Sequence, residues 1–277
     1  MILVKLQGGL GNQLFQYAFG RAMELRHNCP VYYDYNYYGL KPNGIVAKRA
    51  FELHRFGLDL PKATIIRRYL GKIGSRLNLN NFRIIEEKNF NSPEEIKKIH
   101  QGYFIGYWQD VAYFQEYAEE IRGSIRAGFQ LDDQNQELLR QIEQVNAVSV
   151  HVRRGDYLHP KVNRFLTQPV HYYQEAIKTI SNQIDHPVFY FFSDDMEWVK
   201  THLAHCRAKK IYVDINHDSH SYMDLILMSY CKHHILANST FSWWGAYLDL
   251  HQEKIIIAPK EWQNSALANQ NSNSTGI

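Results

Sequence analysis

The feature that most constrains this 277-residue chain is an apolar run that stops abruptly at concentrated charge. Residues 147–152 are mostly β-branched and apolar, as expected of a buried strand. Two arginines, a glycine and an aspartate follow directly, at Arg153, Arg154, Gly155 and Asp156. In open α/β sheets, ligands bind outside the carboxyl ends of the strands. The pattern therefore predicts a strand that delivers charged side chains to a binding site.

The two arginines indicate what the ligand is. A guanidinium presents a planar fork of N–H donors that matches the oxygens of a phosphate group. Gly155 allows close approach of the backbone, and Asp156 is suited either to orient an arginine or to accept a proton. A surface loop with a salt bridge is the alternative interpretation. Because a buried strand leads into the loop, we favour phosphate binding by Arg153 and Arg154.

Two further apolar runs in the second half also end in polar residues. The run 187–192 ends at Ser193 and Asp194, and the run 234–237 is followed by Asn-Ser-Thr-Phe at 238–241. Such residues often cap helices, a structural role that is compatible with ligand binding. Backbone N–H groups and hydroxyls at the start of a helix are well suited to anions. We expect these strand ends and the one at His151 to converge on one ligand.

The beginning of the chain contains a glycine-rich turn between a predicted strand at 2–6 and a helix at 13–26. A second strand, 30–34, ends in Asp34, about 20 residues beyond the glycines, as in dinucleotide-binding βαβ units. However, Leu14 stands where the third glycine of that motif would be. An NAD-dependent oxidoreductase built on this turn is therefore the minor alternative.

Strand and helix patterns alternate in both halves, which predicts an α/β fold with two doubly wound halves. A polar helical segment at 130–146 leads into the central strand, and we place a domain boundary beside it, giving domains 1–135 and 136–277. Residues 36–100 show no clear pattern.

The composition argues against several classes of protein. A formal charge of only +3 argues against a nucleic-acid-binding protein. Three widely spaced cysteines form no disulfide framework, and no run is apolar and long enough to span a bilayer. We expect a cytoplasmic protein. Residues 62–83 carry six basic and no acidic residues; a solvated helix is the favoured interpretation, and peripheral contact with the inner membrane face is the alternative.

No metal is expected in the site. The chain contains no Asp-x-Asp and no P-loop motif, and the helically spaced His202, His205 and Cys206 have no obvious fourth ligand. A site of arginines and helix N-termini suits transfer of a sugar from a nucleotide, because negative charge that develops on the departing diphosphate must be stabilised.

Four motifs make a resemblance specific. They are Gly-Gly-Leu-Gly-Asn-Gln-Leu-Phe-Gln-Tyr-Ala at 8–18, His-Val-Arg-Arg-Gly-Asp at 151–156, Ser-Asp-Asp at 193–195 and Asn-Ser-Thr-Phe-Ser-Trp-Trp-Gly at 238–245. In these motifs the chain resembles the bacterial α-1,2-fucosyltransferases of glycosyltransferase family 11.

The resemblance implies a GT-B-like fold, with two Rossmann-like halves facing a cleft. The first half would be the acceptor side, and the second would bind the donor. The implied reaction is inverting transfer of L-fucose from GDP-β-L-fucose to the 2-hydroxyl of a terminal β-galactoside, without metal or cofactor, in surface-glycan or O-antigen synthesis. The implied acceptor is a galactose-terminated oligosaccharide or a lipid-linked glycan.

The resemblance also implies roles for single residues. Arg153 would grip the donor diphosphate, His151 would lie beside the nucleotide, and Asp224 is matched to a guanine-reading aspartate. Asn12 would lie near the transferred sugar. Asp156 is a candidate for the base by its position alone, with orientation of the two arginines as the equal alternative. The catalytic candidates are thus Arg153, Asp156 and Asn12. The predicted donor-binding residues are His151, Arg153, Arg154, Ser193, Asp194, Asp224, Asn238, Ser239, Thr240 and Phe241. A non-catalytic sugar-binding protein is a third class, given an aromatic content of 14%.

Overall fold

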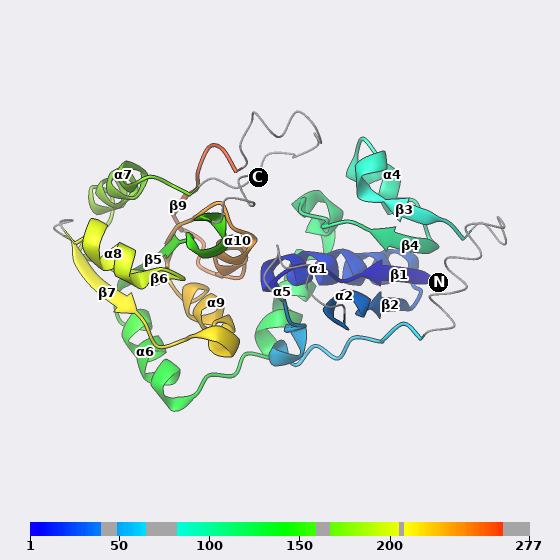
Figure 1. Ribbon diagram of the computed structural model, residues 1–277, viewed down its shortest axis with the longest axis horizontal. Coiled ribbons are helices and arrows are strands. Elements are labelled where there is room, and N and C mark those ends of the chain that lie inside the picture. Colours follow the sequence, from blue (N-terminus) through cyan, green and yellow to red (C-terminus); the bar gives the residue numbers. More distant parts are fainter. Residues whose placement is uncertain (40–48, 65–81, 159–166, 205–207, 263–277) are drawn as a thin grey trace. The chain divides into compact units, whose positions relative to one another are not determined.

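A computed structural model of the chain describes residues 1–39, 49–64, 82–158, 167–204 and 208–262. The chain divides into two compact units, of which the first is Met1–Phe129 and the second begins at Gln130 (Figure 1). Each unit contains a parallel sheet, so the α/β class predicted for both halves is confirmed. Strands are present within two residues of the expected ends at 2–6, 30–34, 147–152, 187–192 and 234–237.

The first unit is built on a four-stranded parallel sheet in the order β2-β1-β4-β3. Its strands are β1 (Ile2–Lys5), β2 (Val31–Asp34), β3 (Ile84–Glu86) and β4 (Gly102–Ile105). Its α-helices are α1 (Leu10–His27), α2 (Asn36–Gly39), α4 (Pro93–Lys97) and α5 (Ala118–Ala127). Short 3₁₀ turns are η1 (Leu53–Phe56), η3 (Glu87–Asn89), η4 (Val111–Tyr113) and η5 (Gln115–Tyr117).

Helix α1 connects β1 to β2 and carries much of the first core. It begins after the glycine turn, where Gly8 has φ +82°, a conformation that glycine adopts without strain. It ends at Asn28, which takes the left-handed conformation common after helices. Phe19 of α1 is fully buried and stacks on Trp108, with ring centroids 4.1 Å apart. The turn before α1 is thus fixed at the carboxyl end of β1.

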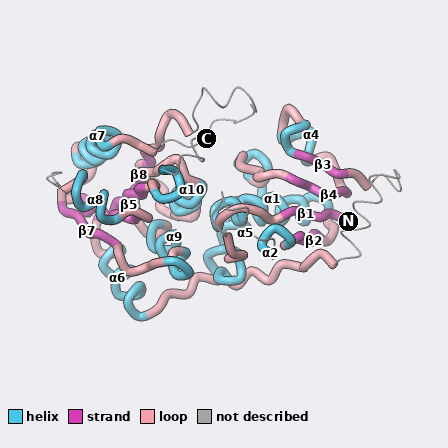
Figure 2. The backbone as a smooth tube through the Cα atoms, viewed as in Figure 1, coloured by secondary structure: helices cyan, strands magenta, loops and turns pink. Residues whose placement is uncertain are grey.

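The second unit is built on a five-stranded parallel sheet in the order β7-β6-β5-β8-β9. Figure 2 distinguishes its strands, in magenta, from its helices, in cyan. Its strands are β5 (Asn146–Val152), β6 (Pro187–Ser193), β7 (Lys209–Val213), β8 (His233–Ile235) and β9 (Ile256–Ile257). Its helices are α6 (Asp133–Glu143), α7 (Val170–Ser181), α8 (Met196–His202), α9 (Tyr222–Met228) and α10 (Thr240–Tyr247). Two 3₁₀ turns are η6 (Gly155–Leu158) and η7 (Asp218–His220).

Helices cover both faces of this second sheet. On one face Val148 and Val150 of β5 pack in a buried cluster with residues of α7 and α8. On the other face Ala147 packs with residues of α6 and α9. Because successive side chains of a strand point to opposite faces, the continuous apolar run of β5 fills both clusters. The expected doubly wound arrangement is therefore present in this unit.

None of the helices in the described ranges is long and apolar enough to cross a membrane. Most of the basic segment 62–83 lies outside the described residues, as do His205 and Cys206.

A buried polar network joins the two central strands to the end of α10. The hydroxyl of Ser149 lies 2.8 Å from His234 Nδ1, and His234 Nε2 lies 3.0 Å from an oxygen of Asp249. All three side chains are buried, so the network is a structural one despite its Ser-His-Asp composition. Asp249 also accepts hydrogen bonds from the backbone and ring of His251. Although burial alone would raise its pKa, these bonds hold the pKa of Asp249 at about 2.

We predict that Asp249→Asn destabilises the second unit in a pH-dependent way. A carboxyl with a depressed folded-state pKa stabilises the fold above its unfolded pKa, and that contribution is lost as the pH falls through the folded value. The shift from 3.8 to about 2 corresponds to about 2 kcal/mol of folding free energy at neutral pH. Urea unfolding at pH 6 and at pH 2.5 checks this. The difference in unfolding free energy between wild type and variant should be larger at pH 6 than at pH 2.5. A difference that does not change with pH would contradict the assigned role of Asp249.

Candidate functional site

The candidate site lies at the carboxyl edge of the second sheet, where the carboxyl ends of the parallel strands meet. Strand β5 is central and pairs with β6 on one side and β8 on the other. In this register Val152 lies opposite Ser193, so the charged loop after β5 and the polar turn after β6 are neighbours. The three strand ends thus meet at one edge of the sheet, as binding of one ligand by all three would require.

Arg153 lies at the centre of this edge. Its Nη1 is 3.0 Å from a carboxylate oxygen of Asp194, and its guanidinium lies 5.6 Å from the ring centroid of Tyr157. Its side chain keeps 24% of its surface exposed. The guanidinium is therefore held in place by a carboxylate and an aromatic ring while part of it still faces solvent, as a phosphate-binding group requires.

Arg154 has different surroundings. Its backbone N–H donates to Asp194 over 2.9 Å, and its Nε donates to Asp195 over 3.1 Å. The guanidinium lies 4.1 Å from the ring centroid of Trp198 on α8, a cation–π contact. Arg154 is thus fixed against α8, whereas Asp194 connects the two arginines. The guanidinium of Arg153, at the centre of the edge, belongs to the more exposed of the two arginine side chains.

The turn after β6 is stabilised by its own polar groups. The Ser193 hydroxyl donates to the carbonyl of Val152 over 2.9 Å and accepts from the backbone N–H of Asp195 over 3.0 Å. Asp195 caps α8 by accepting from Trp198 N–H over 3.1 Å. Asp195 is therefore the capping residue of this turn, which leaves Asp194 to the arginines.

His151 is the buried member of the site. It is only 5% exposed, and its ring centroid lies 5.5 Å from that of Phe241. Burial, together with the nearby charge of Arg153, lowers the pKa of His151 to about 3, so the ring is neutral at physiological pH. Within the described part of the chain its Nδ1 has no hydrogen-bond partner. A neutral imidazole with an unused nitrogen is suited to a nucleotide hydrogen bond.

The third strand end supplies the start of α10. Ser239 caps the helix by accepting from Phe241 N–H over 3.3 Å, and Thr240 is the first helical residue. The Tyr157 hydroxyl donates to the carbonyl of Asn238 over 3.0 Å. This bond ties the turn that follows Arg153 to the start of α10. The two elements predicted to contact phosphate are thus linked directly.

Two further predicted residues are Asp224 and Asp156. Asp224 lies on the first turn of α9, is 9% exposed and accepts a 2.8 Å hydrogen bond from Asn216. Burial raises the pKa of Asp224 to about 7, although that bond opposes the shift. Asn216 in turn bonds to Asn135. Asp156 lies in the turn Gly155–Leu158, and its side chain is outside the described part of the structure.

The glycine turn of the first unit holds the last candidate. Asn12 lies in the first turn of α1, where it is partly exposed, and its Oδ1 accepts a 2.7 Å hydrogen bond from Gln109. The cap of α1 is Gly9, so Asn12 lies within the helix rather than at its cap. Its carboxamide faces the segment that follows β4.

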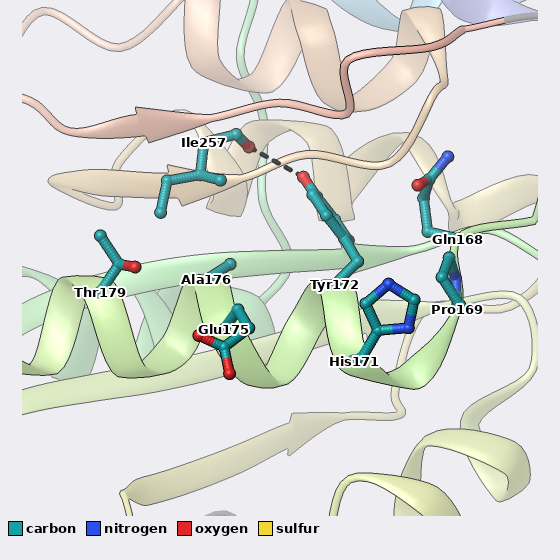
Figure 3. Close-up of a pocket in the computed structure, with 8 residues that line it drawn as sticks. All are labelled: Gln168, Pro169, His171, Tyr172, Glu175, Ala176, Thr179 and Ile257. Carbon is teal, nitrogen blue, oxygen red and sulfur yellow. Dashed lines mark hydrogen bonds between the residues drawn. The ribbon is translucent and has the colours of Figure 1, made fainter.

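A pocket beside α7 lies outside the predicted site. It is lined by residues that include His171, Tyr172, Glu175 and Ile257, and Figure 3 shows them along one side of α7 and beside β9. The Tyr172 hydroxyl donates to the carbonyls of Leu236 and Ile257. Among the described residues, no group of three acidic, histidine or cysteine side chains could hold a metal ion.

Three residues of the site were missed by sequence reasoning as binding candidates: Tyr157, Asp195 and Trp198. Asp195 had a local signal, since it stands three residues before the N–H group that it caps. Tyr157 and Trp198 had none, because their partners lie 81 and 44 residues away in the chain, at Asn238 and Arg154. Their roles depend on the sheet order.

Comparison with known proteins decides the family. The sequence matches the profile of glycosyl transferase family 11 over residues 4–275. The chain belongs to glycosyltransferase family 11. Relatives of this glycosyltransferase include an α-1,2-colitosyltransferase of Escherichia coli, 33% identical and covering 95% of this chain and 92% of the relative. The O-antigen biosynthesis glycosyltransferase WbnK of Escherichia coli is 30% identical and covers 93% of each chain. A galactoside α-(1,2)-fucosyltransferase 2 of Gorilla gorilla gorilla is 27% identical over 63% of this chain and 52% of its own length.

Solved structures show the same fold. The α-1,6-fucosyltransferase NodZ, co-crystallised with GDP, superposes with a TM-score of 0.51 at 13% identity, covering 88% of this chain and 91% of its own. An Arabidopsis thaliana FUT1 mutant in complex with GDP gives a TM-score of 0.52 at 11% identity, covering 94% of this chain and 71% of its own. The predicted GT-B-like class is therefore confirmed. The chain is a transferase of the α-1,2-fucosyltransferase type, which excludes the oxidoreductase and non-catalytic alternatives.

We predict that the Tyr157 hydroxyl matters for nucleotide binding. Tyr157→Phe keeps the ring beside Arg153 but removes the bond to Asn238, so GDP affinity should fall several-fold. Tyr172→Phe is the matched control, because its hydroxyl also donates to strand-end carbonyls but at the pocket beside α7. Each variant should lose about 1 kcal/mol of stability. Calorimetric titration with GDP decides: equal affinities in the two variants would contradict the prediction.

Proposed function

We propose that this glycosyltransferase moves L-fucose from GDP-β-L-fucose to the 2-hydroxyl of a terminal β-galactoside, with inversion, in the synthesis of a surface glycan such as O-antigen. In this proposal the donor binds to residues 136–277, and the acceptor binds to residues 1–135. Membership of family 11 and the names of the Escherichia coli relatives support it.

The observation that carries the proposal is the partly exposed guanidinium of Arg153 at the centre of the carboxyl edge. As the bond between fucose and the β-phosphate breaks, negative charge grows on the diphosphate. A guanidinium can bond two phosphate oxygens at once, so it stabilises that charge where it develops. In the proposed complex Asp194 and Tyr157 hold Arg153 in position, and Arg154 acts through the backbone of the same loop.

The other residues have supporting roles in the proposal. The start of α10, at Ser239, Thr240 and Phe241, offers backbone N–H groups to the diphosphate. His151, neutral and buried beside Phe241, hydrogen-bonds to the nucleotide. The proposed guanine contact of Asp224 and the proposed contact of Asn12 with the transferred sugar complete the set.

A second candidate differs only in the sugar. The relative with 33% identity is an α-1,2-colitosyltransferase, so a GDP-linked colitosyl donor is the specific alternative to GDP-fucose. Both donors present the same nucleoside diphosphate to Arg153. Competition between GDP-fucose and GDP-colitose for one acceptor would decide between them.

We predict that Arg153→Lys folds normally and loses most of its turnover. Lysine is a point charge on a flexible stem and cannot bond two oxygens in a fixed plane. Cations that grip a developing phosphate charge are worth roughly 10³-fold in rate in related chemistry, so a loss of about 10²–10³-fold is expected. The measurement is transfer from GDP-fucose to lactose in the presence of EDTA, with circular dichroism to check folding.

The matched control for this prediction is Arg140→Lys, an exposed arginine paired with Glu137 on α6. It should transfer at the wild-type rate. A folded Arg153→Lys enzyme within about threefold of wild type, a difference of well under 1 kcal/mol, would mean that another group stabilises the diphosphate.

A further inference from the structure

The reaction needs a group that takes a proton. When a hydroxyl attacks the anomeric carbon, its proton must leave, and a carboxylate is the usual acceptor. In the second unit, the two carboxylates after β6 are both engaged: Asp194 bonds to Arg153 and Arg154, and Asp195 bonds to Arg154 and caps α8. Neither is available as a base without breaking the site.

Three carboxylates near the carboxyl edge of the first sheet are also engaged. Asp34, at the end of β2, accepts from the Tyr103 hydroxyl over 2.7 Å and from Asn36 N–H over 3.0 Å. Glu87 accepts from two successive backbone N–H groups after β4, over 2.7 and 2.9 Å. Asp110 caps the 3₁₀ turn η4. Each of these groups has a structural task.

Glu52 is the exception. The segment that carries it is fixed by Gln13 of α1, which is fully buried. The Gln13 carboxamide accepts from Glu52 N–H over 2.8 Å and donates to the carbonyls of Ala50 and Gly8, over 2.8 and 3.2 Å. One side chain thus joins the glycine turn to the backbone of Glu52. The side chain of Glu52 therefore starts from a fixed point beside that turn.

The surroundings of the Glu52 carboxylate suit a base. The positive charges of Arg55 and Arg49 favour its ionised form. Burial raises the pKa of Tyr38, and the negative charge of Glu52 helps to raise it further. The Tyr38 hydroxyl donates to the carbonyl of Gly8 over 3.2 Å. Within the described residues, no donor makes a hydrogen bond or ion pair to this partly buried carboxylate. In the part of the chain that the structure describes, it thus has no structural task of the kind that Asp34, Glu87 and Asp110 have.

Burial raises the pKa of Glu52 above its usual value, although Arg55 and Arg49 oppose the shift. A carboxylate with a raised pKa is more basic and therefore accepts a proton from a hydroxyl more readily.

We propose that Glu52 is the general base of the transfer. The inference rests on the proposed function. The acceptor's 2-hydroxyl oxygen forms its bond to the anomeric carbon, and its proton passes to the Glu52 carboxylate. At the same time the bond from that carbon to the β-phosphate oxygen breaks, and its electron pair leaves with GDP. In this account Gln13 is a positioning residue, because it holds the backbone of Glu52 against the glycine turn.

The first test is Glu52→Gln, which keeps the shape of the side chain but cannot accept the proton. Transfer to lactose should fall at least 10²-fold, as expected for loss of a general base. GDP affinity and melting temperature should stay close to wild type. Glu116→Gln is the matched control, an exposed carboxylate of the same unit that pairs with Arg26, and it should transfer at the wild-type rate.

The second readout is the pH dependence of kcat, which a merely structural role would not change in shape. In wild type, kcat should fall tenfold per pH unit below the pKa of Glu52, because the base is then protonated. The small residual rate of Glu52→Gln should lack this acid limb. If Glu52→Gln does not fold, Glu52→Asp replaces it: the shortened carboxylate should lose at least tenfold in kcat and keep the limb.

The proposal would be overturned if the kcat of Glu52→Gln were within threefold of the wild-type value. It would also be overturned if the kcat of Glu52→Gln still fell at low pH as that of wild type does. Glu52→Asp at the wild-type rate would have the same consequence. If Asp156→Asn lost most of its kcat while Glu52→Gln did not, the base would be Asp156 instead. If wild type binds GDP but transfers no sugar from GDP-fucose or GDP-colitose, the proposed function fails and this inference fails with it. Transfer by both wild type and Glu52→Gln would overturn the base alone.

Discussion

The site depends on the parallel pairing of β5 between β6 and β8. Because the side chains of a strand alternate between faces, a slip of one residue in this register would move His151 and Arg153 to the opposite face. The observed register sets Val152 beside Ser193, and this brings Asp194 within 3.0 Å of Arg153. The apolar residues of β5 fix that register, since they fill clusters on both faces of the sheet. The core therefore determines where the charges lie.

Buried polar groups also determine where the loops at the strand ends lie. Ser149, His234 and Asp249 join β5, β8 and the end of α10, which are elements that carry the second unit's site. In the first unit Gln13 joins the glycine turn to the segment before η1. Such groups cost free energy unless every bond is made, so they specify one arrangement of the backbone around them. Both units thus combine an apolar core with a few internal hydrogen bonds that place the loops at the strand ends.

Much of the second unit could be predicted from sequence, and the reasons are local. The strands at 147–152 and 187–192 are apolar runs bounded by polar residues, and parallel strands must bring their carboxyl ends to one edge. What could not be predicted are contacts between residues far apart in the chain. The Arg154–Trp198 contact and the Tyr157–Asn238 bond exist only because β6 and β8 flank β5. Likewise Glu52 drew no attention in a segment without clear periodicity, because its partner Gln13 lies 39 residues earlier.

The central claim is that the nucleoside diphosphate binds at the carboxyl edge of the second sheet. Hydrogen–deuterium exchange with and without GDP tests it most directly, since it reports protection residue by residue in the unmodified protein. The account predicts that GDP protects backbone amides at 153–158 and 239–242, and leaves those at 175–179, beside the pocket on α7, unchanged. Protection confined to the glycine turn at 8–12, with none after β5 or β8, would contradict it.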